Sequence, residues 1–308
     1  MSYIEVTEKD DQVHITLNRP DALNALNHDM VCRIQEILND YRDKDNIAEI
    51  VFSGAGDRAF CAGGDVKAIY YVGKSDFKTA CSYFYDEYQM NKAIFHYPKP
   101  ITSHCHGFVM GGGYGIAGNS RHIVIDNTIK FAMPETMIGF FPDVGIAYHL
   151  ARAGALGMYI ALTGDVFYAD MMMAAGLATK CLSNFEEPAY LDEIKNHFSK
   201  LSVQEIFQSL EEDNSDFAQE TLKTLKSRSP VSLLVTFQHL QMARDDDFDT
   251  VIARDYRLAC AFFSKHDVYE GIRAQLIDKD RNPRWEHASI DEISQGDIDY
   301  YFEFIDNG

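Results

Sequence analysis

Apolar and polar residues alternate in short, regular patterns over the first two thirds of the chain. Residues 3–18 (YIEVTEKDDQVHITLN) contain two runs with a period of two around a polar turn, which predicts a β-hairpin. Residues 28–43 carry apolar positions at helical spacing, which predicts an amphipathic helix whose buried face holds Met30, Val31, Ile34, Ile37, Leu38 and Tyr41. Further apolar runs predict strands at residues 47–54 (IAEIVFSG), 101–107 (ITSHCHG), 122–126 (HIVID) and 129–134 (IKFAMP).

The pattern turns helical from residue 156 to residue 182, and strand patterns fade from about residue 187. The run of three methionines at 171–173 is typical of a helix core. We therefore expect an α/β core in residues 1–190, followed by a helical region in residues 191–308. We expect that region to cover the active site, to mediate assembly into a homo-oligomer, or to do both.

Composition narrows the function classes. The chain has 308 residues, 46% of them hydrophobic, and a formal net charge of −19. That acidity argues against nucleic-acid binding, so an anionic ligand needs a local basic pocket or backbone N–H groups. Six scattered cysteines suggest reduced thiols, and the acidic N-terminal segment resembles neither a signal peptide nor a mitochondrial transit peptide. With no apolar run long enough to cross a bilayer, we expect a soluble, cytoplasmic protein.

A glycine cluster at residues 106–118 (HGFVMGGGYGIAG) contains a G-x-G-x-x-G pattern, which is also a feature of dinucleotide-binding folds. Such a fold needs a full helix after the glycines and then a strand that ends in an acidic residue. Here the next strand ends at Asp126, only eight residues after Gly118, and Glu135 follows a proline in a turn. Too little chain remains for the crossover helix, which excludes dinucleotide binding.

A second glycine turn lies at residues 54–65 (GAGDRAFCAGGD), again after a strand and before a helix. Two such turns, each with free N–H groups at a helix start, can converge on one ligand oxygen and form an oxyanion hole. The alternative is that both are ordinary tight turns, and for either motif alone this is the better interpretation.

Four motifs in order decide between these interpretations: RAFCAGGD (58–65), HGFVMGGGYG (106–115), AMPETMIGFFPDVG (132–145) and ALTG (161–164). Together they resemble the crotonase (enoyl-CoA hydratase/isomerase) superfamily over nearly the whole chain. The resemblance implies an α/β spiral of ββα repeats that binds acyl-CoA thioesters. It also implies an oxyanion hole formed by the N–H groups of Gly64 and Gly112, with Ala62 and Gly63 against the substrate.

The resemblance also bears on the reaction. Hydratases of the family use two glutamates, at the positions of Gly115 and Glu135 in this chain, so one carboxylate of the pair is missing. Asp143, Glu87 and the tail HDVYEGIRAQLIDKDRNPRW (266–285) instead resemble the 3-hydroxyisobutyryl-CoA hydrolase branch. In such a hydrolase Glu135 activates water or attacks the thioester itself, and Asp143 and Glu87 bind the β-hydroxyl group.

Each acidic residue also has an ordinary structural explanation. Glu135 suits the first turn of a helix, Asp143 suits a turn after a proline, and Glu87 suits an exposed helix surface. His104 and His106 share a strand face, where packing is a better explanation than metal binding because no further ligands are evident. Arg19 and Lys279 are candidates for binding the CoA phosphates, or are ordinary surface charges.

We therefore expect an enzyme that hydrolyses a 3-hydroxyacyl-CoA thioester, with 3-hydroxyisobutyryl-CoA in valine breakdown as the first choice. One alternative is an enoyl-CoA isomerase or hydratase that uses Glu135 alone. The other is a non-catalytic acyl-CoA-binding protein. We expect no metal or redox cofactor, and coenzyme A only as part of the substrate.

Overall fold

The computed structural model describes residues 2–305. The predicted hairpin is present: β1 (Ile4–Lys9) pairs antiparallel with β2 (Gln12–Leu17). Every second side chain of β2 is fully buried, namely Val13, Ile15 and Leu17. The period of two in the sequence therefore marks the face of the hairpin that packs on the core.

The hairpin forms one edge of a six-stranded sheet in the order β1-β2-β3-β5-β7-β9. All pairs after the hairpin are parallel, and the added strands are β3 (Glu49–Gly54), β5 (Ile101–Cys105), β7 (His122–Ile125) and β9 (Lys180–Cys181). Three of these strands confirm predictions. The fourth, β9, corrects one, since its two residues lie at the end of the segment predicted to be helical.

A second, three-stranded parallel sheet consists of β4 (Ala59–Cys61), β6 (Phe108–Met110) and β8 (Lys130–Ala132). The chain alternates between the two sheets: β3 leads to β4, β5 to β6 and β7 to β8. Helices follow each pair of strands. This arrangement is the predicted spiral of ββα repeats. As a result, a turn follows each strand of the small sheet at the same edge of that sheet.

The helices of the core are α1 (His28–Tyr41), α2 (Val66–Ser75), α3 (Phe77–Phe95), α4 (Gly112–Ala117), α5 (Ile146–Arg152), α6 (Ala155–Thr163) and α7 (Ala169–Ala174). The predicted apolar face of α1 is buried, except that Tyr41 is only partly covered. Asn27 caps this helix by accepting a hydrogen bond from the N–H of Met30 at 2.9 Å. Met171 and Met172 are buried in α7, as the prediction of a helix core requires.

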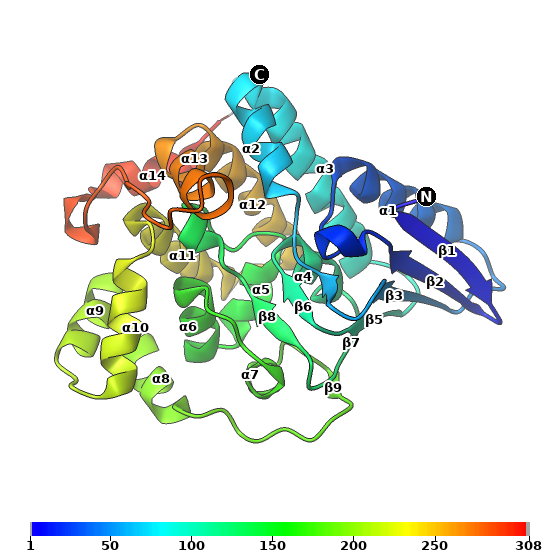
Figure 1. Cartoon of the computed structure of the whole chain (residues 1–308), viewed down its shortest axis with the longest axis horizontal. Coiled ribbons are helices and arrows are strands. Elements are labelled where there is room, and N and C mark those ends of the chain that lie inside the picture. The colour runs from blue at the N-terminus through cyan, green and yellow to red at the C-terminus, as the bar shows by residue number, and fades with distance from the viewer. Residues whose placement is uncertain (1, 306–308) are drawn as a thin grey trace.

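The last third is helical, as predicted, with α8 (Leu191–Phe198), α9 (Val203–Glu211), α10 (Asp216–Lys226), α11 (Pro230–Ala243), α12 (Phe248–Phe263), α13 (His266–Ile272) and α14 (Gln295–Glu303). These helices pack directly on the core: α12 on α3, α11 on α5, and α8 and α10 on α6 (Figure 1). Since α11 is apolar on nearly all sides, it lies inside the molecule. The division into two regions at residue 190 stays a prediction.

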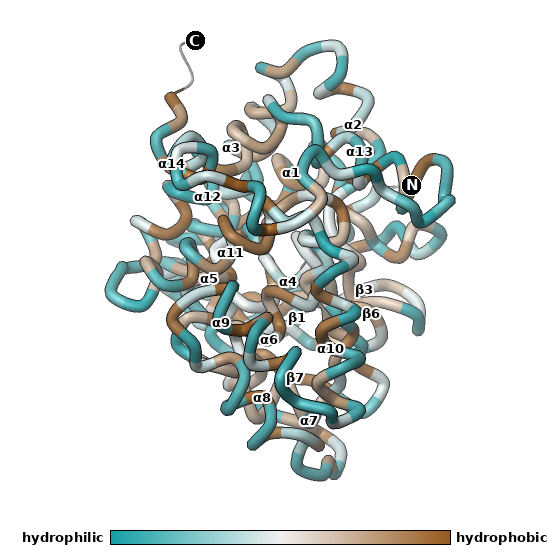
Figure 2. Tube along the Cα trace, turned by 90° about the vertical axis from the view of Figure 1, so that its left-hand side faces the viewer, coloured by the Kyte–Doolittle hydropathy of each residue, from teal (hydrophilic) through white to brown (hydrophobic). Residues whose placement is uncertain are grey.

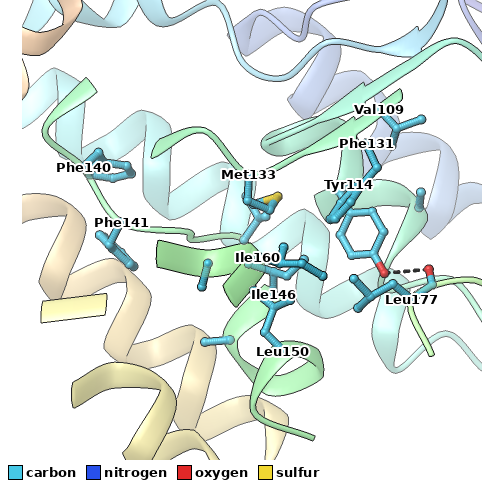
Figure 3. Close-up of a cluster of buried hydrophobic side chains, with 14 of the residues drawn as sticks. Val109, Tyr114, Phe131, Met133, Phe140, Phe141, Ile146, Leu150, Ile160 and Leu177 are labelled. Carbon is cyan, nitrogen blue, oxygen red and sulfur yellow. Dashed lines mark hydrogen bonds between the residues drawn. The ribbon is translucent and has the colours of Figure 1, made fainter. Parts of the chain in front are cut away.

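The strands of the small sheet and their turns are embedded in the core. Figure 3 shows Val109 of β6, Tyr114 of α4 and Phe131 of β8 in one buried cluster, which also contains side chains of α5 and α6. The hydroxyl of Tyr114 donates a hydrogen bond to the carbonyl of Leu177 at 2.8 Å. In Figure 2 the outer turns are mostly hydrophilic and the hydrophobic stretches lie inside. This packing fixes the backbone of the turns described next.

Candidate active site

Three turns meet at the carboxyl edge of the small parallel sheet. Strand β4 leads into Ala62–Gly64, β6 into Gly111–Gly112 and β8 into Pro134–Glu135. Ligands of α/β proteins bind outside the carboxyl ends of parallel strands, where the backbone turns away from the sheet. The three motifs that stand out in the sequence are therefore brought together by the register of a single sheet.

These turns open into a cavity of about 1280 Å³. Every residue that the sequence analysis selected for the site lines this cavity: Arg19, Ala62, Gly63, Gly64, Glu87, Gly112, Glu135, Asp143 and Lys279. The C-terminal region contributes a wall through Phe263, Val268, Ile272 and Leu276. The structure thus places all of the selected residues in one site, although they span more than 250 positions of the chain.

Two backbone N–H groups, those of Gly64 and Gly112, lie in neighbouring turns that line the cavity. Gly112 begins α4, and Gly64 directly precedes Asp65, whose side chain caps α2. The turns lie close together, because a β-carbon added to Gly112 would be 3.4 Å from the nitrogen of Gly64. Within residues 2–305, neither N–H donates to another residue. An oxyanion hole needs two such donors, close together and without an acceptor of their own.

Three carboxyl groups are buried in the same cavity: Glu87 on α3, Glu135 in a short 3₁₀ helix (Glu135–Ile138), and Asp143 in the following loop. Their exposed fractions are 3%, 6% and 6%. In the part of the chain that the structure describes, no ion pair joins any of them to a lysine or arginine. The interpretation of Glu87 as an exposed helix charge is therefore wrong.

Burial raises the pKa of all three carboxyls, and nearby negative charge adds to the effect. For Glu87 and Glu135, burial is the main cause and the negative charge of Asp143 is the next, and each pKa lies well above its usual value. Burial also raises the pKa of Asp143, to about 7. The charge of Asp143 opposes the ionisation of both glutamates, so the titrations of these groups depend on one another.

Tyr88 is a site residue that the sequence analysis missed. Its hydroxyl donates a hydrogen bond to Oδ2 of Asp143 at 2.6 Å, and both groups are buried. One oxygen of Glu87 (Oε1) and one of Glu135 (Oε2) have no partner within residues 2–305. Buried polar atoms are normally hydrogen-bonded, so the two unpaired acceptors indicate where a ligand donor fits.

Gly115 stands where hydratases of the family carry their other glutamate, and the packing around it leaves no space for a side chain. A β-carbon on Gly115 would lie 2.8 Å from Cβ of Val144 and 2.9 Å from Nδ2 of Asn91, so no side chain fits there. The sequence shows that the carboxylate is missing. The packing shows in addition that the space for it has been filled.

Basic side chains surround the mouth of the cavity. Besides Arg19 and Lys279 they include Arg58, Lys67 and Arg281, which the sequence analysis missed because isolated charges carry no spacing signal. Arg19 also pairs with Asp65 at 3.0 Å.

The loop that carries two of these cations, Lys279 and Arg281, is held by Arg273. The guanidinium of Arg273 donates to Asp278 and to Asp280, each at 2.7 Å.

His104 and His106, on the strand predicted at residues 101–107, do not pack together in the core and belong to no group of metal-ligand side chains among the described residues. His104 is exposed, so the prediction that it packs in the core is wrong, and His106 is partly buried. In residues 2–305 one group of metal-ligand side chains comes together, His28, Cys32 and Asp86, with ligand atoms within 4.8 Å of one another. It lies outside the lining of the cavity, on the surface of α1 and α3.

Comparison with known proteins identifies the family. A model of the enoyl-CoA hydratase/isomerase family matches residues 12–191 and 183–302. The chain belongs to the enoyl-CoA hydratase/isomerase family. Among solved structures of the fold, a carnitinyl-CoA dehydratase from Mycobacterium thermoresistibile has a TM-score of 0.94 at 34% identity, covering 100% of this chain and 98% of its own. An enoyl-CoA hydratase from Rhodobacter sphaeroides has a TM-score of 0.93 at 32% identity, with 99% and 98% covered.

Curated relatives within this family carry a different name. The chain is 37% identical to a protein of Xenopus tropicalis named mitochondrial 3-hydroxyisobutyryl-CoA hydrolase, over 95% of this chain and 86% of that one. The proteins of the same name from Dictyostelium discoideum and Homo sapiens are 38% and 35% identical, over 95% and 94% of this chain and 89% and 86% of their own. The structure contains no helix in residues 2–305 that is long and apolar enough to cross a membrane.

Proposed function

We propose that this protein hydrolyses 3-hydroxyisobutyryl-CoA to 3-hydroxyisobutyrate and free CoA, a step of valine breakdown. The observation that carries the proposal is that two backbone N–H groups, of Gly64 and Gly112, line the same cavity as the buried Glu135 and donate to no other described residue. The closed position at Gly115 disfavours hydration, which needs a second carboxylate. The names of the curated relatives support the same reaction.

The thioester carbonyl is expected to accept hydrogen bonds from Gly64 and Gly112. Negative charge develops on this oxygen in the transition state, and one such donor contributes about 2.7–4 kcal/mol. Glu135 lies beside this site, because a β-carbon on Gly111 would be 3.0 Å from its Oε1. We therefore expect the two donors and the reacting carboxylate to act on one carbonyl group.

Glu135 has two routes to the acid product. In one, it removes a proton from water as the water oxygen attacks the carbonyl carbon. In the other, its own oxygen attacks, and water then hydrolyses the acyl anhydride. In both routes the carbon–sulfur bond breaks, and the CoA sulfur leaves with the bonding electron pair and takes up a proton. The raised pKa of Glu135 makes it a stronger base than an ordinary glutamate once it is ionised.

Asp143 and Glu87 are expected to bind the β-hydroxyl of the acyl group. Tyr88 already occupies Oδ2 of Asp143, and Oε1 of Glu87 has no partner among the described residues. The hydroxyl has one hydrogen to donate, so a substrate without it leaves one buried acceptor unpaired, which is costly. The five cations at the mouth are expected to bind the phosphates of CoA.

The experiment that tests the proposal measures free-thiol release by the wild type from 3-hydroxyisobutyryl-CoA. Crotonyl-CoA and a β,γ-enoyl-CoA serve as comparison substrates. Release from the first substrate supports the hydrolase. Hydration of crotonyl-CoA or a double-bond shift in the β,γ-enoyl-CoA, with no thiol release, would establish a hydratase or isomerase. Tight binding of all three without turnover would establish a binding protein.

Three further properties stay predictions. Location in the cytoplasm stays a prediction, and the curated relatives are named as mitochondrial. We propose that no cofactor other than the CoA of the substrate takes part. Assembly into a homo-oligomer is likewise a proposal that the family resemblance suggests.

A further inference from the structure

The loop after Asp143 has an unusual backbone. Val144 and Gly145 both have positive φ angles, of 57° and 80°. Glycine adopts this conformation readily, but a β-branched valine does so only when its surroundings hold it there. Val144 is buried, and it directly follows Asp143. Asp143, Glu87 and Glu135 line one end of the cavity, which we call the acyl end.

The C-terminal region holds this loop through a buried carboxylate. Oδ2 of Asp255 on α12 accepts a hydrogen bond from the N–H of Gly145 at 2.7 Å. Its Oδ1 lies 2.7 Å from Nε2 of His239 on α11. Both side chains are fully buried. The carboxylate therefore has one partner in the active-site loop and one in the innermost helix of the C-terminal region.

Arg254 determines which ring nitrogen of His239 carries the proton. Nδ1 of His239 lies 3.4 Å from Nη1 of Arg254, and a guanidinium can only donate. Nδ1 therefore accepts, and Nε2 carries the proton that is donated to Asp255. Arg254 is in turn paired with Asp246. The chain of contacts runs from the protein surface to the active-site loop.

The other side of the loop is also held. Nδ2 of Asn119 donates to the carbonyl of Val144 at 3.0 Å, and the N–H of Ile146 donates to the carbonyl of Asp143 at 3.0 Å. The charge of Asp255 is close enough to contribute to the raised pKa of Asp143, after the larger effect of burial. Asp255 thus has both a contact with the loop and an electrostatic effect on its carboxyl group.

We propose that Asp255 and His239 are positioning residues that hold the Asp143 carboxyl at the acyl end of the cavity and thereby set the preference for β-hydroxylated acyl groups. This inference rests on the proposed function, in which Asp143 binds the β-hydroxyl. It assigns the C-terminal helices α11 and α12 a role in selectivity, in addition to their role in closing the core.

The test compares four variants: His239→Leu, His239→Gln, Asp255→Asn and the double variant Asp255→Asn/His239→Gln. Leucine removes the donor to Asp255, and glutamine keeps one. In the single Asp255→Asn variant the new amide N–H faces the N–H of His239. In the double variant the glutamine oxygen accepts that amide, so both hydrogen bonds return without the charge.

The measured quantity is the ratio of kcat/KM for 3-hydroxyisobutyryl-CoA to that for isobutyryl-CoA. We expect a fall of about 10- to 100-fold in His239→Leu and in Asp255→Asn, the size of effect that a small misplacement produces. We expect His239→Gln and the double variant to keep most of the preference. His197→Gln is the matched control: His197 is also buried and lies 3.1 Å from a carboxylate, Asp213, but on α8, away from the cavity.

An unchanged ratio in His239→Leu and Asp255→Asn would overturn the inference. This includes equal losses of kcat/KM on both substrates, which a merely structural role predicts. Binding of the two CoA esters, measured by calorimetry, keeps the inference separate from the proposed function. If the wild type releases no CoA, the hydrolase proposal fails. The preference for the hydroxylated ester in binding, and its loss in the variants, still tests the positioning role.

Discussion

The two ends of the active-site cavity hold their charges in opposite ways. At the acyl end, Glu87, Glu135 and Asp143 are buried and have raised pKa values, and they form no ion pairs with a lysine or arginine among the described residues. At the mouth, Lys279 and Arg281 are exposed, as are Arg58 and Lys67. The negative end is preorganised by packing, and the positive end lies in solvent.

The difference corresponds to the two parts of an acyl-CoA. Buried charges destabilise the folded protein, and they occur where catalysis needs a reactive group in a site that excludes water. Exposed cations attract an anionic nucleotide, but water and salt weaken each contact. We therefore expect substitutions at the acyl end to change kcat strongly, and substitutions at the mouth to change KM mildly.

Glu135→Gln is expected to have the largest effect. The amide has nearly the same shape, so the fold is retained, but it can neither accept a proton nor attack the thioester. CoA release from 3-hydroxyisobutyryl-CoA should fall by about 10²–10⁴-fold in kcat, the usual contribution of a positioned base. A variant that keeps more than half of the wild-type kcat would remove Glu135 from the mechanism.

Gly112→Ala tests the backbone donors. The added methyl group would overlap the carboxylate of Glu87, so the turn must shift. We expect kcat to fall by about 10²–10³-fold, as when one oxyanion donor is lost. Gly296→Ala is the matched control, because Gly296 also lies in the first turn of a helix, α14, without a positive φ, and the added carbon would be in ordinary contact, 3.7 Å from Oγ of Ser294. Similar kcat losses in both variants would contradict the assignment.

Asp143→Asn tests whether the carboxylate at the acyl end selects the β-hydroxyl group. An amide can still accept from Tyr88, but it no longer offers a charged acceptor to the β-hydroxyl. We expect kcat/KM to fall about tenfold more for 3-hydroxyisobutyryl-CoA than for isobutyryl-CoA, in line with the cost of one lost hydrogen bond to a charged group. Equal losses on the two esters would show that Asp143 does not select the hydroxyl.

The double variant Lys279→Ala/Arg281→Ala tests the mouth. Because both residues are exposed, we expect KM to rise only about two- to fivefold while kcat stays unchanged. The rise should shrink at high salt, which screens the same contacts. Lys195→Ala on α8 is the matched control, with a side chain that is 61% exposed and remote from the cavity. A loss in kcat instead of KM would contradict this division of roles.

The acyl end was largely predictable from sequence, and the reason is local. Gly64, Gly112 and Glu135 lie directly after short strands, so their positions follow from the strand pattern once the motifs are aligned. The burial of Glu87 is also indicated by the sequence, because Glu87 lies at helical spacing between Phe84 and Asn91, which are both buried.

The remaining site residues could not be found in this way. Asp255 contacts a loop 110 residues earlier in the chain, and His239 lies on a helix without a polar stripe. The cations Arg58 and Arg281 meet only because distant loops share the mouth of the cavity. Contacts of this kind depend on how the C-terminal helices pack on the spiral, which no local pattern encodes.

The pH dependence of CoA release tests the central claim, that a buried cluster of carboxyls with raised pKa values carries out the reaction. Glu135 must lose its proton to act, and burial and the charge of Asp143 raise its pKa. The account therefore predicts that kcat/KM rises with pH at a midpoint well above the usual pKa of a glutamate. In Asp143→Asn the midpoint should move to lower pH, because a neighbouring negative charge has been removed. A midpoint at the ordinary carboxylate value, or one that Asp143→Asn does not move, would contradict the account.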